Sequence, residues 1–275
     1  MLLDFNAPIP QQFAAKLAAG VTTLNLMKNN LGKQTGAKLA LAFKAIPARV
    51  NTLNLEMNNL GTLPATELGE AFKVIPVGIT KLNLGYNNLG TRTGKELVLV
   101  FKGLPSGLTT LKLGWNNLDR HTKEDLALAF AAIPPSVTKL YLNGNNLGAF
   151  DKAKLILAFR ALPAGVTTID LRSNNLDKKP EEEWIELLKA LPDTVTKIIS
   201  DKGVLGKIAG DFQTIRNHPS STPTGLSFIS VIKDIVLNYK VPDCSFWAKN
   251  GEKIEGKYPG SVENETEALK EVPFS

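Results

Sequence analysis

The chain has 275 residues, of which 43% are hydrophobic, and a formal net charge of +6. Its one cysteine, Cys244, and its two histidines, His121 and His218, exclude an intramolecular disulfide and a zinc cluster of Cys and His ligands. No run approaches the roughly 18 consecutive apolar residues of a transmembrane helix, so an integral membrane protein is not expected.

The N-terminal segment, residues 1–20, predicts a cap rather than a leader. Asp4 lies near its start, and no basic stretch precedes an apolar one, so it does not resemble a cleavable secretion signal. Phe13 and Leu17 lie four residues apart within Ala7–Gly20 and predict one apolar helical face. We expect this segment, half a repeat in length, to cover the N-terminal end of the core formed by residues 21–200.

Residues 21–200 contain a repeat with a period of 29 residues. The string NNL occurs six times, each time after two apolar residues that are separated by one other residue. A fixed period between about 20 and 50 residues is typical of a solenoid, in which each unit packs on its neighbours. The first asparagines of these strings are Asn29, Asn58, Asn87, Asn116, Asn145 and Asn174.

Each unit begins with a short predicted strand. Leu24 and Leu26 are separated by one residue, which places both leucines on the same buried face. The chain must turn away near Asn29, and the turn leaves backbone N–H and C=O groups without partners. Because an Asn side chain both donates and accepts hydrogen bonds, the six stacked asparagines are predicted to form a buried structural ladder.

The second half of each unit predicts a helix that ends before a proline. Leu39, Phe43 and Ile46 are spaced by four and three residues, which places them on one helical face, and Pro47 follows. Helices about 10 Å wide cannot stack at the strand spacing of about 4.8 Å, so the array is expected to curve with the strands inside.

The unit fits LxxLxLxxNxL, with Leu24, Leu26, Asn29 and Leu31 in the first copy. This pattern resembles the leucine-rich repeat, and the 29-residue unit with a full helix resembles its ribonuclease-inhibitor subtype. The resemblance implies an α/β horseshoe with a parallel concave sheet and convex helices. Units of the form VTxLxLxxNNLG, followed by LAxAFxxIP, are also similar to the leucine-rich-repeat proteins of Legionella. Many of those resemble effectors that type IV secretion delivers into host cells.

Residues 201–275 are expected to form a helical C-terminal cap and an acidic tail. Helices are predicted near Val204–Arg216 and at Leu226–Tyr239. The tail resembles the secretion signals of such effectors, because four glutamates precede a few apolar residues. The resemblance therefore implies secretion without a signal peptide and a location in the host cytoplasm. The glutamates are Glu263, Glu265, Glu267 and Glu271.

The concave face offers the candidate binding residues. Positions between the buried leucines point away from the core and vary between units, whereas the framework does not. Aromatic residues and Met are favoured at interface hot spots. Gly85 and Gly114, beside Tyr86 and Trp115, are expected to give a partner access to the rings; alternatively, the rings pack on each other and stiffen the sheet. The candidates are Met27, Met57, Tyr86, Trp115, Tyr141, Lys112, Asp170 and Arg172.

These observations predict a monomeric, non-enzymatic module that binds a host protein, with no catalytic residue, cofactor, metal or nucleic acid. Two alternatives stay open. One is a ubiquitin-ligase-like enzyme or adaptor whose activity lies in residues 201–275, although Asp243 precedes Cys244 instead of an acid coming after it. The other is an anionic-membrane binder that uses a convex column of bases. These bases also suit helix C-termini, and they are Lys44, Lys73, Lys102, Arg160 and Lys189.

Overall fold

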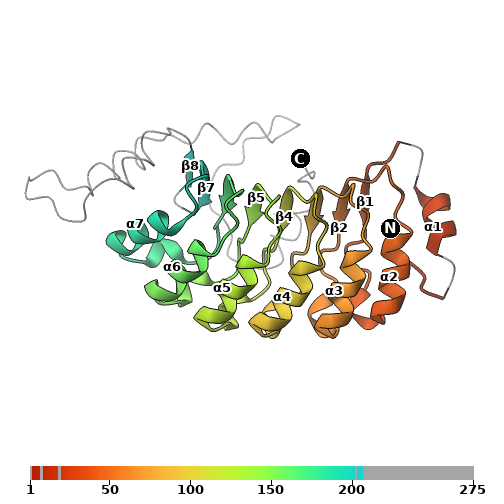
Figure 1. Ribbon diagram of the computed structural model, residues 1–275, viewed down its shortest axis with the longest axis horizontal. Helices are drawn as coiled ribbons and strands as arrows, with labels where there is room; N and C mark the ends of the chain where they lie inside the picture. The colour runs from red at the N-terminus through yellow and green to blue at the C-terminus, as the bar shows by residue number, and fades with distance from the viewer. Residues whose placement is uncertain (1, 7–8, 18–19, 202, 207–275) are drawn as a thin grey trace, which may run out of the picture.

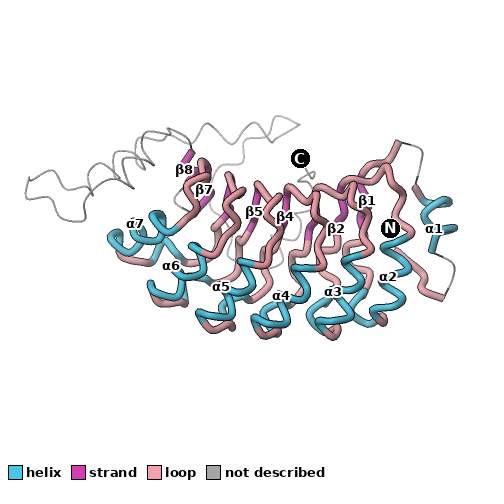
Figure 2. The backbone as a smooth tube through the Cα atoms, viewed as in Figure 1, coloured by secondary structure: helices cyan, strands magenta, loops and turns pink. Residues whose placement is uncertain are grey.

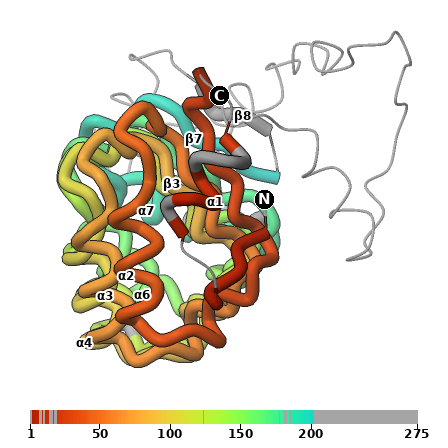
Figure 3. Tube along the Cα trace, turned by 90° about the vertical axis from the view of Figure 1, so that its right-hand side faces the viewer, coloured from red at the N-terminus to blue at the C-terminus, as the bar shows by residue number. Residues whose placement is uncertain are grey.

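The computed structural model describes residues 2–6, 9–17, 20–201 and 203–206. Within these ranges the chain is one array of strand–turn–helix units. Figure 1 and Figure 2 show the helices side by side along one side of the array and the strands along the other. Viewed along the array, successive units lie behind one another as turns of a coil (Figure 3). The predicted α/β solenoid is confirmed.

The strands form one sheet whose order follows the chain. The first seven pair in parallel, and each register advances by one repeat, so that Leu24 lies opposite Leu53 and Leu53 opposite Leu82. Equal unit lengths therefore place equivalent residues in columns across the sheet. The parallel strands are β1 (Thr23–Asn25), β2 (Thr52–Asn54), β3 (Lys81–Asn83), β4 (Thr110–Lys112), β5 (Lys139–Tyr141), β6 (Thr168–Asp170) and β7 (Lys197–Ser200).

Each unit continues from its strand through a short 3-10 helix into an α-helix. Most of the α-helices begin at a side-chain cap; Thr93, for example, accepts a hydrogen bond from the Glu96 N–H while the Glu96 carboxylate accepts one from the Thr93 N–H. The α-helices are α1 (Ile9–Lys16), α2 (Gly36–Lys44), α3 (Ala65–Lys73), α4 (Gly94–Lys102), α5 (Lys123–Ala131), α6 (Lys152–Arg160) and α7 (Glu181–Ala190). The 3-10 helices are η1 (Leu31–Lys33), η2 (Leu60–Thr62), η3 (Leu89–Thr91), η4 (Leu118–Arg120), η5 (Leu147–Ala149) and η6 (Leu176–Lys178).

The hydrophobic core runs through the whole array between strands and helices. The strand leucines, such as Leu24 and Leu26, are fully buried. A column of phenylalanines lies at the helix side of the core, and each is at most 1% exposed. This column begins in α1, so the N-terminal helix extends the core of the first unit. Its members are Phe13, Phe43, Phe72, Phe101, Phe130 and Phe159.

The C-terminal end differs from the sequence-based prediction where the structure describes it. Gly203–Gly206 forms β8, antiparallel to β7, instead of the start of a helix. The chain reverses near Asp201 and pairs with the last parallel strand, which gives that strand's edge a hydrogen-bonding partner. Leu226–Tyr239, Cys244, His218 and the tail 261–275 lie outside the described residues. Within the described part, none of the helices has the length and apolarity needed to cross a bilayer.

Candidate functional site

The open face of the sheet, meaning the face opposite the buried leucines, carries the variable residues. In each three-residue strand the central residue points into the core, and its two neighbours point to the other side. The second and third residues after each strand, for example Gly85 and Tyr86 after β3, complete the face. Equivalent side chains therefore lie about 4.8 Å apart in columns that cross the strands.

Two aromatic rings stack on this face. The ring centroids of Tyr86 and Trp115 lie 5.4 Å apart, with an angle of 8° between the ring planes. Both side chains are half-buried. A stacked pair of this kind contributes about 0.5–1.5 kcal/mol beyond the burial of its area. We call Tyr86 and Trp115 the aromatic pair; they do pack on each other, and they also leave part of their surface exposed.

The aromatic pair stands on a left-handed backbone. The φ angles are +54° at Tyr86 and +58° at Trp115, in a region that bulky residues rarely adopt. Such a conformation costs a non-glycine residue roughly 1–2 kcal/mol. The next unit has Gly144 at the equivalent position, with φ +69°. Glycine adopts this conformation without the steric penalty.

Gly144 also makes room for the pair. A Cβ atom added to Gly144 would lie 2.4 Å from the Trp115 ring, closer than two non-bonded carbon atoms can approach. The Trp115 ring therefore lies between Tyr86 and the backbone of Gly144, stacked along the array. This packing holds the ring in place, and Trp115 as a whole is half-buried.

The expectation that Gly85 and Gly114 leave open space beside the rings is wrong. A Cβ atom on Gly114 would lie 2.7 Å from the Asn143 Oδ1, and one on Gly85 would lie 3.1 Å from the Asn83 Oδ1. Side chains of nearby strands already occupy this space. The two glycines are buried, and they permit close packing between units instead of access for a partner.

A polar row crosses the centre of the open face, and we define it by Glu56, Asn83, Lys112, Tyr141, Asp170 and Arg172. The Asn83 Nδ2 donates to the Glu56 carboxylate at 2.8 Å. Burial raises the pKa of Glu56, while Asn83, Lys112 and Lys28 act in the opposite direction. The sequence prediction missed Glu56 and Asn83 as site residues. The signal for Glu56 was a carboxylate in a column that otherwise holds Met27, Gly85, Gly114, Asn143 and Arg172.

Lys112 and Tyr141 form the middle of the polar row. The Lys112 ammonium lies 5.3 Å over the Tyr141 ring centroid, a cation–π contact. Burial lowers the pKa of Lys112, whereas the charges of Glu56 and Asp170 raise it. Burial also raises the pKa of the Tyr141 hydroxyl. Tyr141 therefore belongs to the polar row, not to the aromatic pair.

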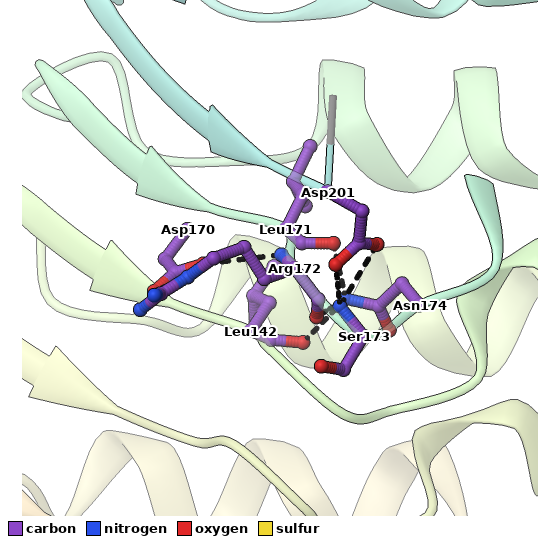
Figure 4. Close-up of polar contacts among 7 residues, drawn as sticks. All are labelled: Leu142, Asp170, Leu171, Arg172, Ser173, Asn174 and Asp201. Atoms are coloured by element: carbon purple, nitrogen blue, oxygen red, sulfur yellow. Dashed lines mark hydrogen bonds and ion pairs between the residues drawn. The ribbon is translucent and has the colours of Figure 1, made fainter. Parts of the chain in front are cut away.

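Asp170 and Arg172 end the row as a bidentate ion pair (Figure 4). The Arg172 Nη2 lies 2.7 Å from the Asp170 Oδ2, and its Nε lies 3.0 Å from the Oδ1. Asp170 is only 1% exposed, whereas the Arg172 side chain is 48% exposed. Next to them, the Ser173 N–H donates to both carboxylate oxygens of Asp201, at 2.9 and 3.0 Å. Asp201 was not predicted, because its role depends on the reversal into β8.

The two candidate methionines, Met27 and Met57, lie in the N-terminal half of the array. Met57 is half-buried and occupies the unit before Tyr86 in the same left-handed column, with φ +56°. Met27 lies in the neighbouring column, where its N–H donates to the Asn25 Oδ1 at 3.0 Å. Met57 therefore extends the column that contains the aromatic pair, whereas Met27 belongs to the column that contains Glu56.

The six predicted ladder asparagines are buried at the turn after each strand. The Asn58 Nδ2 donates to the carbonyls of Leu26 and Leu55, both at 2.9 Å, and its Oδ1 accepts from the Asn29 N–H at 2.7 Å. The Asn58 N–H in turn donates to the Asn87 Oδ1. The Asn58 amide thus joins its own turn to the preceding unit, which is a structural task.

Other titratable groups in the described ranges do not assemble into a metal site. No three His, Cys, Asp or Glu side chains there are grouped so that they could hold an ion. His121 directly follows η4 and is 5% exposed, and its Nε2 has no hydrogen-bond partner among the described residues. Burial, the largest influence, lowers its pKa.

No model of a known protein family matches this chain, and no curated protein matches it. A solved structure does: a leucine-rich repeat-containing protein from Legionella pneumophila, LegL7, is 36% identical, with a TM-score of 0.66. The match covers 72% of this chain and 61% of that protein. The repeated units, the ordered parallel strands and this likeness together identify the chain as a leucine-rich-repeat protein.

Proposed function

We propose that this protein is an interaction module that binds a host protein on its open face, as a secreted bacterial effector. The observation that carries the proposal is the aromatic pair on its left-handed backbone. Gly or Asn would fit that backbone at lower conformational cost. A Tyr and a Trp at adjacent equivalents of this position are therefore not explained by the turn itself.

The surroundings of the pair favour a protein ligand. Rigid aromatic side chains with part of their surface exposed are the residues that dominate binding free energy at interfaces. The polar row supplies fixed charges beside them, with Arg172 held by Asp170 and Lys112 held over Tyr141. Preorganised groups lose little conformational entropy when a partner binds.

The proposal is tested by replacing each ring with a residue that suits the same backbone. Tyr86→Asn and Trp115→Asn are expected to weaken binding of the partner about 30-fold each, corresponding to about 2 kcal/mol for a hot-spot residue. The partner is first recovered from host lysate with the unaltered protein and then titrated in purified form. Leu128→Asn, at a 47% exposed position on α5, is the matched control. Unchanged affinity of both ring variants would exclude this face as the anchor.

Export is a separate part of the proposal. It is supported by the likeness to the Legionella protein and by the acidic composition of residues 261–275. Deleting residues 261–275 is expected to abolish translocation of an enzyme reporter into host cells, while circular dichroism of the deleted protein stays unchanged. Delivery at the level of the full chain would contradict the secretion role of the tail.

A further inference from the structure

A row of lysines follows one side of the open face, and we define the lysine row as Lys81, Lys139 and Lys197. They occupy the first position of β3, β5 and β7, and the strands between them carry Thr110 and Thr168 there. Lys139 and Lys197 are exposed, and Lys81 is half-buried. Their ammonium groups make no hydrogen bond or ion pair with another residue in the described ranges.

The acidic groups of the open face are already engaged elsewhere. Asp170 is held by Arg172, Glu56 accepts from Asn83, and Asp201 accepts from the Ser173 N–H. None of these carboxylates forms an ion pair with a lysine of the row, so the charge of the lysine row is available to a partner. A partner with complementary charge associates faster, and the paired charges fix the register in which it binds.

The spacing of the row constrains the form of that partner. Alternate strands of a sheet are about 9.6 Å apart, twice the strand spacing. A polyproline II segment has three residues per turn and rises about 3.1 Å per residue, so every third side chain lies on one face at about 9.3 Å. In a β-strand, side chains on one face are an even number of residues apart, which gives about 6.6 or 13 Å.

We propose that the open face receives an extended acidic segment of the partner protein, laid across the strands, with a carboxylate at every third residue. These carboxylates pair with Lys81, Lys139 and Lys197. The lysines begin the strands and the aromatic pair lies five residues further on, roughly 15 Å away, so each contacts a different part of the partner. The inference rests on the proposed function and defines the chemistry of the ligand.

The test uses the full chain and a fluorescent peptide of five Glu-Pro-Pro repeats, which presents one carboxylate per turn. Anisotropy titrations at about 50 mM salt are expected to show binding that weakens strongly at high salt, as for exposed charge pairs. Charge reversal of the row, Lys81→Glu, Lys139→Glu and Lys197→Glu together, should weaken binding at least tenfold. The matched convex control is Lys44→Glu, Lys102→Glu and Arg160→Glu, which should change it less than twofold.

Two peptides decide whether spacing matters. A peptide of equal composition with its five glutamates contiguous should bind at least fivefold more weakly, and five Lys-Pro-Pro repeats should not bind. Equal binding of the contiguous peptide, or an equal loss in the convex control, would overturn the inference. Peptide binding reports on the lysine row, and binding of the purified partner to the Tyr86→Asn and Trp115→Asn variants reports on the aromatic pair, so failure of one and failure of the other are separate results.

Discussion

At the scale of single residues, the buried amides show how one side chain in each unit can join neighbouring units of the solenoid. The Asn58 side chain makes five hydrogen bonds to backbone atoms of two units, with Leu26, Leu55, Glu56, Asn29 and Leu31 as partners. Carbonyls and N–H groups that face a turn inside the core find no water there. The amide offers two N–H donors and a carbonyl acceptor in one neutral side chain, whereas a hydroxyl has only one donor.

Asn58→Ala is expected to lower the free energy of unfolding by about 3 kcal/mol, because several buried backbone groups lose their partner at once. Urea denaturation followed by circular dichroism measures the change. Asn59→Gly is the control: Asn59 is exposed and left-handed, and glycine keeps that conformation, so its effect should stay below about 0.5 kcal/mol. Equal losses in the two variants would contradict a structural ladder.

His121 should make stability depend on pH. Its pKa in the folded protein lies below the ordinary value, mainly because burial disfavours the charged imidazole; Lys154 also lowers it, whereas Asp125 and Asp119 raise it. The contribution of neutral His121 to the free energy of unfolding is therefore complete above the unfolded pKa of about 6.5. It is lost as the pH falls toward the lower pKa that His121 has in the folded protein.

His121→Phe removes this titration. The next unit places Phe150 at the equivalent position, where the ring is buried, so the substitution has a precedent within the chain. Melting temperatures between pH 7.5 and about 5 should fall less for the variant than for the unaltered protein. Parallel plots of melting temperature against pH for the two proteins would show that His121 does not titrate in this pH range.

At the scale of elements, turns add unit-to-unit contacts to those made by strands and helices. The Trp115 ring packs against the turn of the next unit at Gly144, and Tyr86 packs against Trp115. The left-handed turn thus carries the stacking from one unit to the next. Its strain of roughly 1–2 kcal/mol is offset in part by the stacked rings.

Gly144→Ala should be destabilising by about 2 kcal/mol, since a methyl group would collide with the Trp115 ring and would also occupy a left-handed backbone. In a Trp115→Asn background the collision is absent, and the cost should fall to about 1 kcal/mol, which is the backbone part alone. A double-mutant cycle measured in urea gives this coupling. Additive effects would mean that the ring does not rest on Gly144.

At the scale of the whole molecule, the period of the sequence anticipated the fold because the repeats are nearly uniform. Equal units must pair in equal register, and apolar residues at strand and helix spacing must point inward together. The solenoid was predicted on this basis and is confirmed. The helix predicted near Val204–Arg216 was wrong over Val204–Gly206, because pairing with the edge of β7 is a tertiary contact that no local periodicity signals.

The candidate surface could be predicted only in part from the sequence. Columns could be read from the repeat, so Tyr86, Trp115, Lys112 and Arg172 were identifiable as open-face residues. Their roles in binding stay a prediction. What lies beside them depended on side-chain packing: Asn143 fills the space at Gly114, and Glu56 is drawn into the polar row by Asn83.

Spacing along the chain was enough to establish the repeating unit, its period, the inward leucines and the positions of the buried amides. Folding in three dimensions was needed to establish that Tyr86 stacks on Trp115, that Gly144 supports the ring, and that Asp170 and Arg172 form a bidentate pair. The reason is physical. Spacing fixes the direction in which a side chain leaves the backbone, whereas its partners depend on the shapes of side chains that adjacent turns bring within a few ångströms.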